Sequence, residues 1–93
     1  MALETHMQHL LKSREPPKTF CPSEVARRLT ADELQDLGYN DGWRDAMPDI
    51  RRLAFDMRDQ GTMEVLQKGG VLGDDVGLDD VVGPIRLRRA RGR

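Results

Sequence analysis

The chain has 93 residues, which is enough for one domain and too few for two. Its 15 Lys and Arg residues nearly balance its 16 Asp and Glu residues. The net charge of −1 excludes a whole-surface attraction to nucleic acid or to anionic lipid, so any such binding requires a local patch.

Cysteine use and hydropathy bear on the compartment. Cys21 is the only cysteine, so no internal disulfide can form, as in a reducing cytoplasm. No apolar run approaches the roughly 20 residues of a membrane span. Polar residues interrupt the apolar positions between Met1 and Leu11, unlike the apolar block of a signal peptide. We therefore expect a complete, cytoplasmic chain.

The N-terminal part predicts two helices separated by a proline turn. Residues 3–11 carry apolar side chains at helical spacing, and Pro16-Pro17 ends this first helix. Residues 18–20 then form a very short extended piece. Cys21-Pro22-Ser23-Glu24 begins the second helix, because Pro or Ser suits a first turn and Glu24 favours the positive end of the helix dipole. Val25, Ala26 and Leu29 form its inner face.

Two further helices follow. Thr30 and Glu33 have the spacing of a capping box, which predicts a short acidic helix at 31–37 that Gly38 ends. Residues 43–60 have the strongest helical periodicity of the chain. Pro48 interrupts this periodicity, so we expect a first turn at 43–47 and a main helix from about 48 to 60.

The C-terminal part predicts two strands. Residues 62–68 alternate as a strand does, and Gly69-Gly70 ends the alternation. Residues 71–82 read as a loop, and Gly83-Pro84 opens a second strand from Ile85 to Arg88 or Arg89. The result is an α+β, winged-helix-like fold. It has a three-helix core, the short extra helix at 31–37, and a C-terminal two-stranded hairpin wing.

This order places residues 1–88 in one winged-helix-like domain and residues 89–93 in a basic, flexible tail. The apolar spacing predicts which side chains are buried between the elements. The predicted core comprises Leu10, Val25, Leu29, Trp43, Ile50, Ala54, Met57, Val65 and Ile85.

Several sequence blocks occur together in an order that is more specific than any block alone. They are C-P-S-E-V-A-R at 21–27, W-R at 43–44, M-P at 47–48, Val65 with Q-K-G at 67–69, and G-P-I-R-L-R at 83–88. Together they resemble a family of small bacterial domains of unknown function. The resemblance implies a winged-helix-like fold and no established activity, so it supports the fold and adds almost nothing on function. The sequence departs from that pattern in two places. The link at 30–42, between the second helix and Trp43, is longer than usual, and the loop at 70–83 is longer and more acidic than usual.

An arginine stripe is the first candidate binding surface. Arg44, Arg51 and Arg58 lie seven positions apart, so they stack beside the apolar arc of their helix, with Phe55 in the same stripe. In winged-helix proteins this helix commonly enters the DNA major groove, where Arg contacts phosphates or guanine edges. The favoured alternative is a solvated helix whose Arg and Asp residues pair at spacings of three and four. The separate stripe of aspartates would repel a groove.

The C-terminal segment is the second candidate. Arg86, Arg88, Arg89, Arg91 and Arg93 place five arginines in eight residues, and phosphate binding by them would be salt-dependent. The favoured alternative is a solubilising end, or a strand with Arg86 and Arg88 on its exposed face. DNA and RNA are not separable here, because the segment has no aromatic platform of the single-strand type.

Two other patterns favour structural interpretations. Residues 24–29 have the E-V-A-x-x-L form common in helix-turn-helix units, but the acidic segment after them favours a packing helix. Asp74, Asp75, Asp79 and Asp80 lack the ligand order of a calcium loop. An acidic wing tip should not enter a DNA groove, although it suits a basic partner or the chain's own arginine tail.

Metal and catalytic sites are not expected. His6 and His9 have a spacing that presents two zinc ligands, but even with Cys21 a fourth ligand is missing. The chain has no Ser-His-Asp arrangement with supporting motifs, no glycine-rich phosphate loop, and no cysteine with a convincing base. We therefore expect no enzyme, no cofactor, no metal, no membrane association and no evident small-molecule substrate.

The sequence predicts a non-catalytic accessory or regulatory module. The first hypothesis is binding of DNA or RNA through the arginine stripe and the basic C-terminal segment. The alternative is a protein–protein interaction module on a winged-helix scaffold, without nucleic-acid binding. The predicted contact residues are Arg44, Arg51, Phe55, Arg58, Arg86, Arg88, Arg89 and Arg91.

Overall fold

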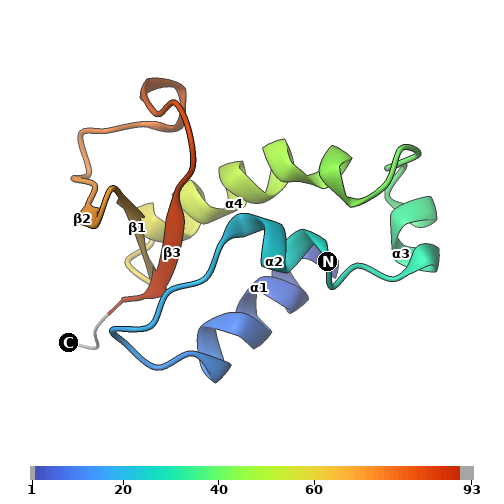
Figure 1. Ribbon diagram of the computed structural model, residues 1–93, viewed down its shortest axis with the longest axis horizontal. Coiled ribbons are helices and arrows are strands. Elements are labelled where there is room, and N and C mark those ends of the chain that lie inside the picture. Colours follow the sequence, from blue (N-terminus) through green and yellow to red (C-terminus); the bar gives the residue numbers. More distant parts are fainter. Residues whose placement is uncertain (1, 91–93) are drawn as a thin grey trace.

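The fold is described for residues 2–90, from a computed structural model (Figure 1). Within this range it is an α+β domain, as the sequence predicts. The helices are α1 (Ala2–Ser13), α2 (Pro22–Ala26), α3 (Ala31–Asp36) and α4 (Met47–Asp59), with short 3₁₀ helices η1 (Trp43–Ala46) and η2 (Leu78–Asp80). The strands are β1 (Met63–Gln67), β2 (Gly70–Val71) and β3 (Arg86–Arg89).

The sheet is antiparallel with the strand order β2-β1-β3. On its other edge, β3 is joined to Phe20 by two backbone hydrogen bonds, of 2.9 and 2.7 Å, between Phe20 and Leu87. The predicted extended piece at 18–20 is therefore part of the sheet architecture, and β3 lies between β1 and Phe20.

The predicted wing had two strands, but the sheet has three, because the chain turns back directly after β1 and forms the short strand β2. Lys68 and Gly69 adopt positive φ angles of 53° and 82°, which reverses the chain so that β2 pairs with the end of β1. Arg89, which we predicted to lie in a flexible tail, is the last residue of β3 and pairs with Met63. Arg91 and Arg93, which we also assigned to the tail, lie outside the described residues.

Local signals in the sequence account for the helix boundaries. The predicted capping box is present, since Glu33 N–H donates to Thr30 Oγ1 (3.1 Å) and Thr30 N–H donates to Glu33 Oε1 (2.9 Å). Gly38 follows α3 with a φ of 79°, as expected of a glycine that ends a helix. The predicted break near Pro48 is confirmed, because η1 gives way to α4 at Met47.

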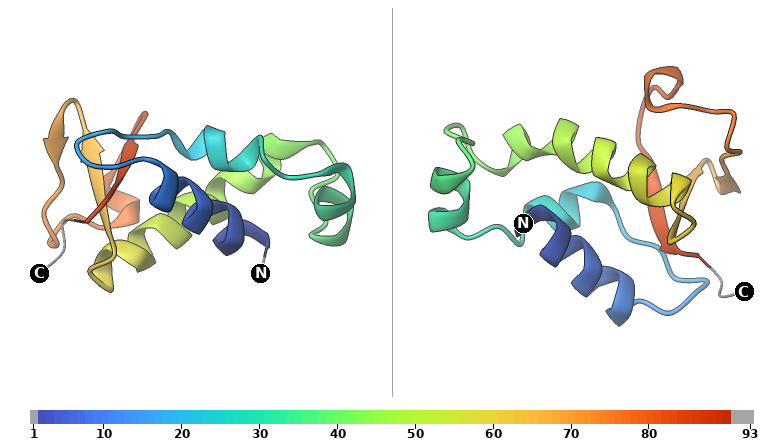
Figure 2. Two further views of the ribbon diagram at one scale, coloured as in Figure 1. Left: turned by 90° about the horizontal axis from the view of Figure 1, so that it is seen from below. Right: turned by 180° about the vertical axis from the view of Figure 1, so that it is seen from behind.

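The core lies between α1, α2, α4 and the inner face of the sheet, and α3 lies at the opposite end of the molecule from the sheet (Figures 1 and 2). All predicted core residues are buried except Trp43, which is only partly buried at the edge of the core. Phe20 is fully buried beneath the sheet edge. In residues 2–90, no helix has the length and apolar character needed to cross a bilayer.

Candidate functional site

The predicted arginine stripe of α4 does not form one exposed surface. Phe55 is only 4% exposed and Arg58 only 8%. The Arg58 guanidinium lies over the Phe55 ring, 4.7 Å from its centroid, and donates to the carbonyl oxygens of Gly73 and Val76. Our expectation that Phe55 and Arg58 stand outside the apolar arc is wrong, because the loop after β2 folds back over this half of α4.

Arg88 is neutralised within the sheet. Arg88 and Glu64 are directly opposite one another in the β1–β3 register, and Arg88 Nε donates to Glu64 Oε1 over 2.7 Å. The Arg88 side chain is only 16% exposed. A charge whose partner lies directly across the sheet contributes little to binding of an external anion, so Arg88 is a weak candidate contact. Arg89 is partly buried and has no carboxylate partner among residues 2–90.

Arg44 belongs to a cluster that the sequence did not predict. The Trp43 ring is contacted by two guanidinium groups, with its centroid 4.6 Å from Arg44 Cζ and 5.0 Å from Arg27 Cζ. Arg27 is the C-cap of α2 and Trp43 begins η1, so this cluster exists only because α2 packs on η1. Contacts of this kind hold the two exposed guanidiniums in fixed positions.

Among residues 2–90, Arg51 and Arg86 form hydrogen bonds only with neutral acceptors. Arg51 Nη2 donates to the carbonyl oxygen of Gly83 (3.3 Å). Arg86 donates to Thr19 Oγ1 (2.9 Å), to the Thr19 carbonyl oxygen, and to Cys21 Sγ. These bonds orient the two guanidiniums without cancelling their charge.

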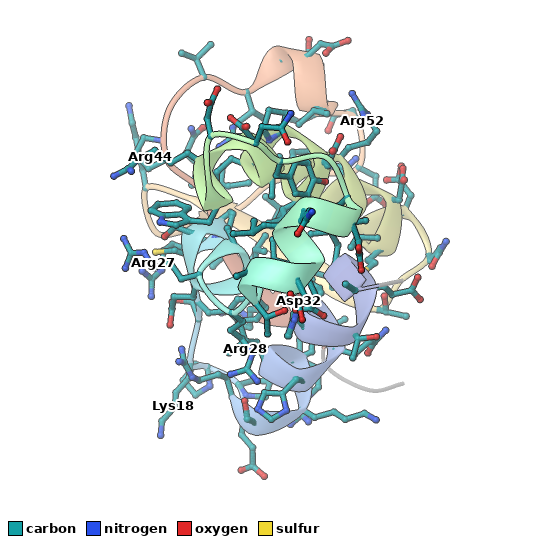
Figure 3. All side chains as sticks on the ribbon, turned by 90° about the vertical axis from the view of Figure 1, so that its right-hand side faces the viewer. Lys18, Arg27, Arg28, Asp32, Arg44 and Arg52 are labelled. Atoms are coloured by element: carbon teal, nitrogen blue, oxygen red, sulfur yellow. The ribbon has the colours of Figure 1, made fainter. Side chains whose placement is uncertain are left out.

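Four arginines therefore form one cationic surface, which we call the arginine face: Arg27, Arg44, Arg51 and Arg86. Within the described range, none of them has a carboxylate at ion-pair distance, whereas Arg14, Arg52, Arg58 and Arg88 all do. Figure 3 shows Arg27 and Arg44 along one edge of the molecule and Arg52 on the opposite side. Arginines without carboxylate partners project a positive potential into solvent.

Glu24 is the carboxylate that acts electrostatically on Arg86. Its oxygens are already engaged, because Arg14 Nη2 donates to one (2.9 Å) and the Cys21 N–H donates to the other (2.8 Å). Burial opposes ionisation, but these hydrogen bonds and the charges of Arg14 and Arg86 hold the pKa of Glu24 below its ordinary value. Glu24 is therefore an ionised residue of the scaffold, bound to other partners.

An apolar trough borders the arginine face. It consists of two shallow hollows that share Met47 and Arg51 at the start of α4. One hollow extends past Arg52 to Leu78, and the other extends to Pro22 at the start of α2 and to Pro84 before β3. Gln67 fixes the position of this last segment, since its Nε2 donates to the carbonyl oxygens of Val82 (2.8 Å) and Pro84 (3.4 Å).

The histidines and acidic residues do not gather into a metal site. Across residues 2–90, no three His, Cys, Asp or Glu side chains are grouped as metal ligands. His6 Nε2 lies 2.9 Å from Glu33 Oε1 and so joins α1 to α3. The hydrogen bonds from Thr30 N–H and from His6 lower the pKa of Glu33, which keeps this contact charged on the carboxylate side.

The geometry defines a small α+β domain with one cationic surface beside an apolar trough. Residues 1–90 match the family described as "Protein of unknown function (DUF3253)", and the chain belongs to this family. The resemblance to a family of unknown function is thereby confirmed. No curated protein matches the chain.

Proposed function

We propose that the protein is a non-catalytic, cytoplasmic interaction module that binds a protein partner through the arginine face and the adjoining trough. The scaffold is proposed to be winged-helix-like. Three helices, α1, α2 and α4, precede the β1–loop–β3 unit, and Phe20 pairs with β3 from the other side. This is the order of helices and strands in winged-helix domains, which supports the proposal.

One observation carries the function. Four arginines without carboxylate partners border a trough lined by Met47, Pro22 and Pro84, and Trp43 lies among them. Arg, Trp and Met are enriched in protein–protein interfaces, and Arg and Trp dominate the residues whose truncation costs most affinity. The combination of oriented charge and accessible apolar surface is that of an interface centre.

Nucleic acid is the second candidate, because a cluster of unpaired arginines also suits phosphate. Charges elsewhere on the surface count against it. On α4, Asp56 is exposed without an ion-pair partner among residues 2–90, and the loop between β2 and β3 likewise presents Asp74 and Asp75. These carboxylates oppose entry of α4 or of the loop into a groove. We therefore rank a protein partner first, reversing the order that the sequence suggested.

Capture from an extract of its source cells, with and without nuclease, tests this function. Tagged wild-type protein is compared with Arg51→Ala and with a control variant, Lys12→Ala. Both variants lose one positive charge, but Lys12 is an exposed residue in the last turn of α1 and lines neither hollow of the trough. We expect to capture a protein that is retained after nuclease treatment, is lost with Arg51→Ala and is kept with Lys12→Ala.

Two results would count against this function. Capture that is lost after nuclease treatment would favour nucleic acid over protein as the partner. No difference between the Arg51→Ala and Lys12→Ala variants would exclude the arginine face as the binding surface.

A further inference from the structure

We propose that the arginine face recognises an extended acidic peptide segment, with an apolar side chain of that segment seated in the trough. This inference rests on the proposed function and names the partner's chemistry.

The trough has apolar lining residues on both sides of Arg51, which suits an apolar side chain of a bound segment. Its two hollows share Met47, and their outer walls are Leu78 in one and the prolines Pro22 and Pro84 in the other. Met is flexible and polarisable, so it adapts to apolar side chains of different shape. The prolines give the second wall a rigid backbone, since their φ angles are fixed.

The charges around the trough select an acidic partner. Arg51 lines both hollows, and Arg86 is hydrogen-bonded to Cys21, which lines the second hollow. Arg44 lies one turn before Met47, and Arg27 lies one turn after Ser23, another residue of the second hollow. Guanidinium groups bind carboxylates with two parallel hydrogen bonds, and the arginine face leaves such donors unpaired by carboxylates among residues 2–90.

A peptide fits this surface better than a nucleic-acid strand. The Trp43 ring is already contacted by Arg27 and Arg44, so it is not a free platform for base stacking. The trough offers aliphatic, thioether and proline surface. A short acidic segment meets only the arginine face, whereas a longer phosphate backbone would continue past it to the aspartates of α4 and of the 72–84 loop.

The experiment uses a library of short random peptides displayed on phage, selected on the whole protein. Enriched peptides are then synthesised, and affinity is measured from the fluorescence of Trp43, which is the only tryptophan of the chain. We expect enriched peptides to place Asp or Glu beside Leu, Ile, Met or Phe. Arg51→Ala should weaken their binding about tenfold, while the control Lys12→Ala leaves it unchanged, because Lys12 lines neither hollow.

The trough is tested first by changing the peptide, because such changes cannot affect the fold of the protein. Replacing the apolar residue of an enriched peptide with Gly, or its acidic residues with Asn and Gln, should each weaken binding about tenfold. Met47→Gln, checked for folding by circular dichroism, should weaken the parent peptide and have little effect on the Gly-substituted peptide.

Each alternative outcome overturns the inference in a distinguishable way. Enriched peptides without acidic residues, or with equal affinity for Arg51→Ala and Lys12→Ala, would exclude acidic recognition at this face. Binding of single- or double-stranded oligonucleotides that depends on Arg51, with no face-dependent peptide, would make nucleic acid the ligand. If Arg51-dependent capture of a protein persists while no acidic peptide binds, the proposed function stands and this inference fails. If neither occurs, both fail.

Discussion

The two halves of α4 carry arginines at equivalent helical positions and use them in opposite ways. Arg51, in the N-terminal half, touches one carbonyl oxygen and keeps its charge at the surface. Arg58, two turns later, is buried over Phe55 and donates hydrogen bonds to two carbonyl oxygens of the loop after β2. Helical spacing gives the direction of a side chain, but the segment that packs over it decides whether the side chain binds a partner or supports the fold.

Replacing the two arginines tests this difference most strongly. Arg58→Ala should lower the free energy of unfolding by about 2–3 kcal/mol, because it leaves the Gly73 and Val76 carbonyl oxygens without their charged donor. Arg51→Ala should lower it by less than about 0.5 kcal/mol. Urea unfolding followed by circular dichroism measures both. Equal losses in the two variants would show that the halves of α4 do not differ as described.

Tyr39 sharpens the comparison on the side of α4 away from the arginine face. Its hydroxyl donates to Asp49 Oδ2 (2.7 Å), and burial together with the Asp49 carboxylate raises the pKa of Tyr39 to about 12. Tyr39→Phe should cost about 1 kcal/mol at neutral pH, measured by urea unfolding.

The raised pKa of Tyr39 also predicts a dependence on alkaline pH. Because the neutral phenol is favoured in the folded state, its contribution is fully present below the ordinary pKa of 10.0 and is lost as pH rises towards 12. Ultraviolet absorbance gives the titration. A tyrosine that ionises near pH 10 in the folded protein would contradict the Asp49 contact.

On β3, Arg88 is paired with a carboxylate and Arg86 is not, and this difference can be measured. A double-mutant cycle with Arg88→Ala and Glu64→Ala should give a coupling free energy of about 0.5–1 kcal/mol, as expected for a cross-strand ion pair that is partly buried. The matched cycle with Arg86→Ala and Glu64→Ala should give none, since Arg86 bonds to Thr19 and Cys21 instead. Thermal unfolding measures both cycles. Coupling in the second cycle would show that Arg86 interacts with the Glu64 carboxylate and would remove Arg86 from the arginine face.

Glu24 gives the smallest expected effect. The lowered pKa of Glu24 means that its ionised form stabilises the folded state above the ordinary value of 4.5, and that this contribution is lost as pH falls through the lower folded value. The wild type should therefore be more stable than Glu24→Gln at neutral pH, and the difference should disappear in acid. Acid titration of both proteins by circular dichroism measures it. A difference that grows as pH falls would reverse the sign of the proposed linkage.

Sequence reasoning succeeded where the signal was local. Thr30 and Glu33 predicted α3 because a capping box involves residues three positions apart, and Pro48 predicted the change from η1 to α4 because its ring disrupts the helix at that point. Phe55 and Arg58 were misplaced, because Phe55 belongs to the core cluster and Arg58 is bonded to carbonyl oxygens of a loop that the helix pattern does not contain.

The residues of the arginine face were only partly predictable. Arg44, Arg51 and Arg86 were predicted as contacts, but Arg27 joins them only through the packing of α2 on η1. Arg88 and Glu64 face each other only in the β1–β3 register, which the strand pattern alone left open. Contacts between elements distant in sequence therefore decided which arginines remain unpaired.

The position of β3 between β1 and Phe20 has a consequence for how the domain forms. Thr19 and Arg86, which are hydrogen-bonded across this junction, are 67 positions apart in the chain. During synthesis the helices and β1 emerge first. The backbone groups of Phe20 and of one edge of β1 stay unpaired until β3, which pairs with both, has been made. Closing so long a segment is entropically slow, so folding should be limited by the docking of β3. A nascent chain that lacks β3 lacks the fully buried core residue Leu87 and leaves one edge of β1 unpaired, so it should be the species most prone to aggregate or to engage a chaperone.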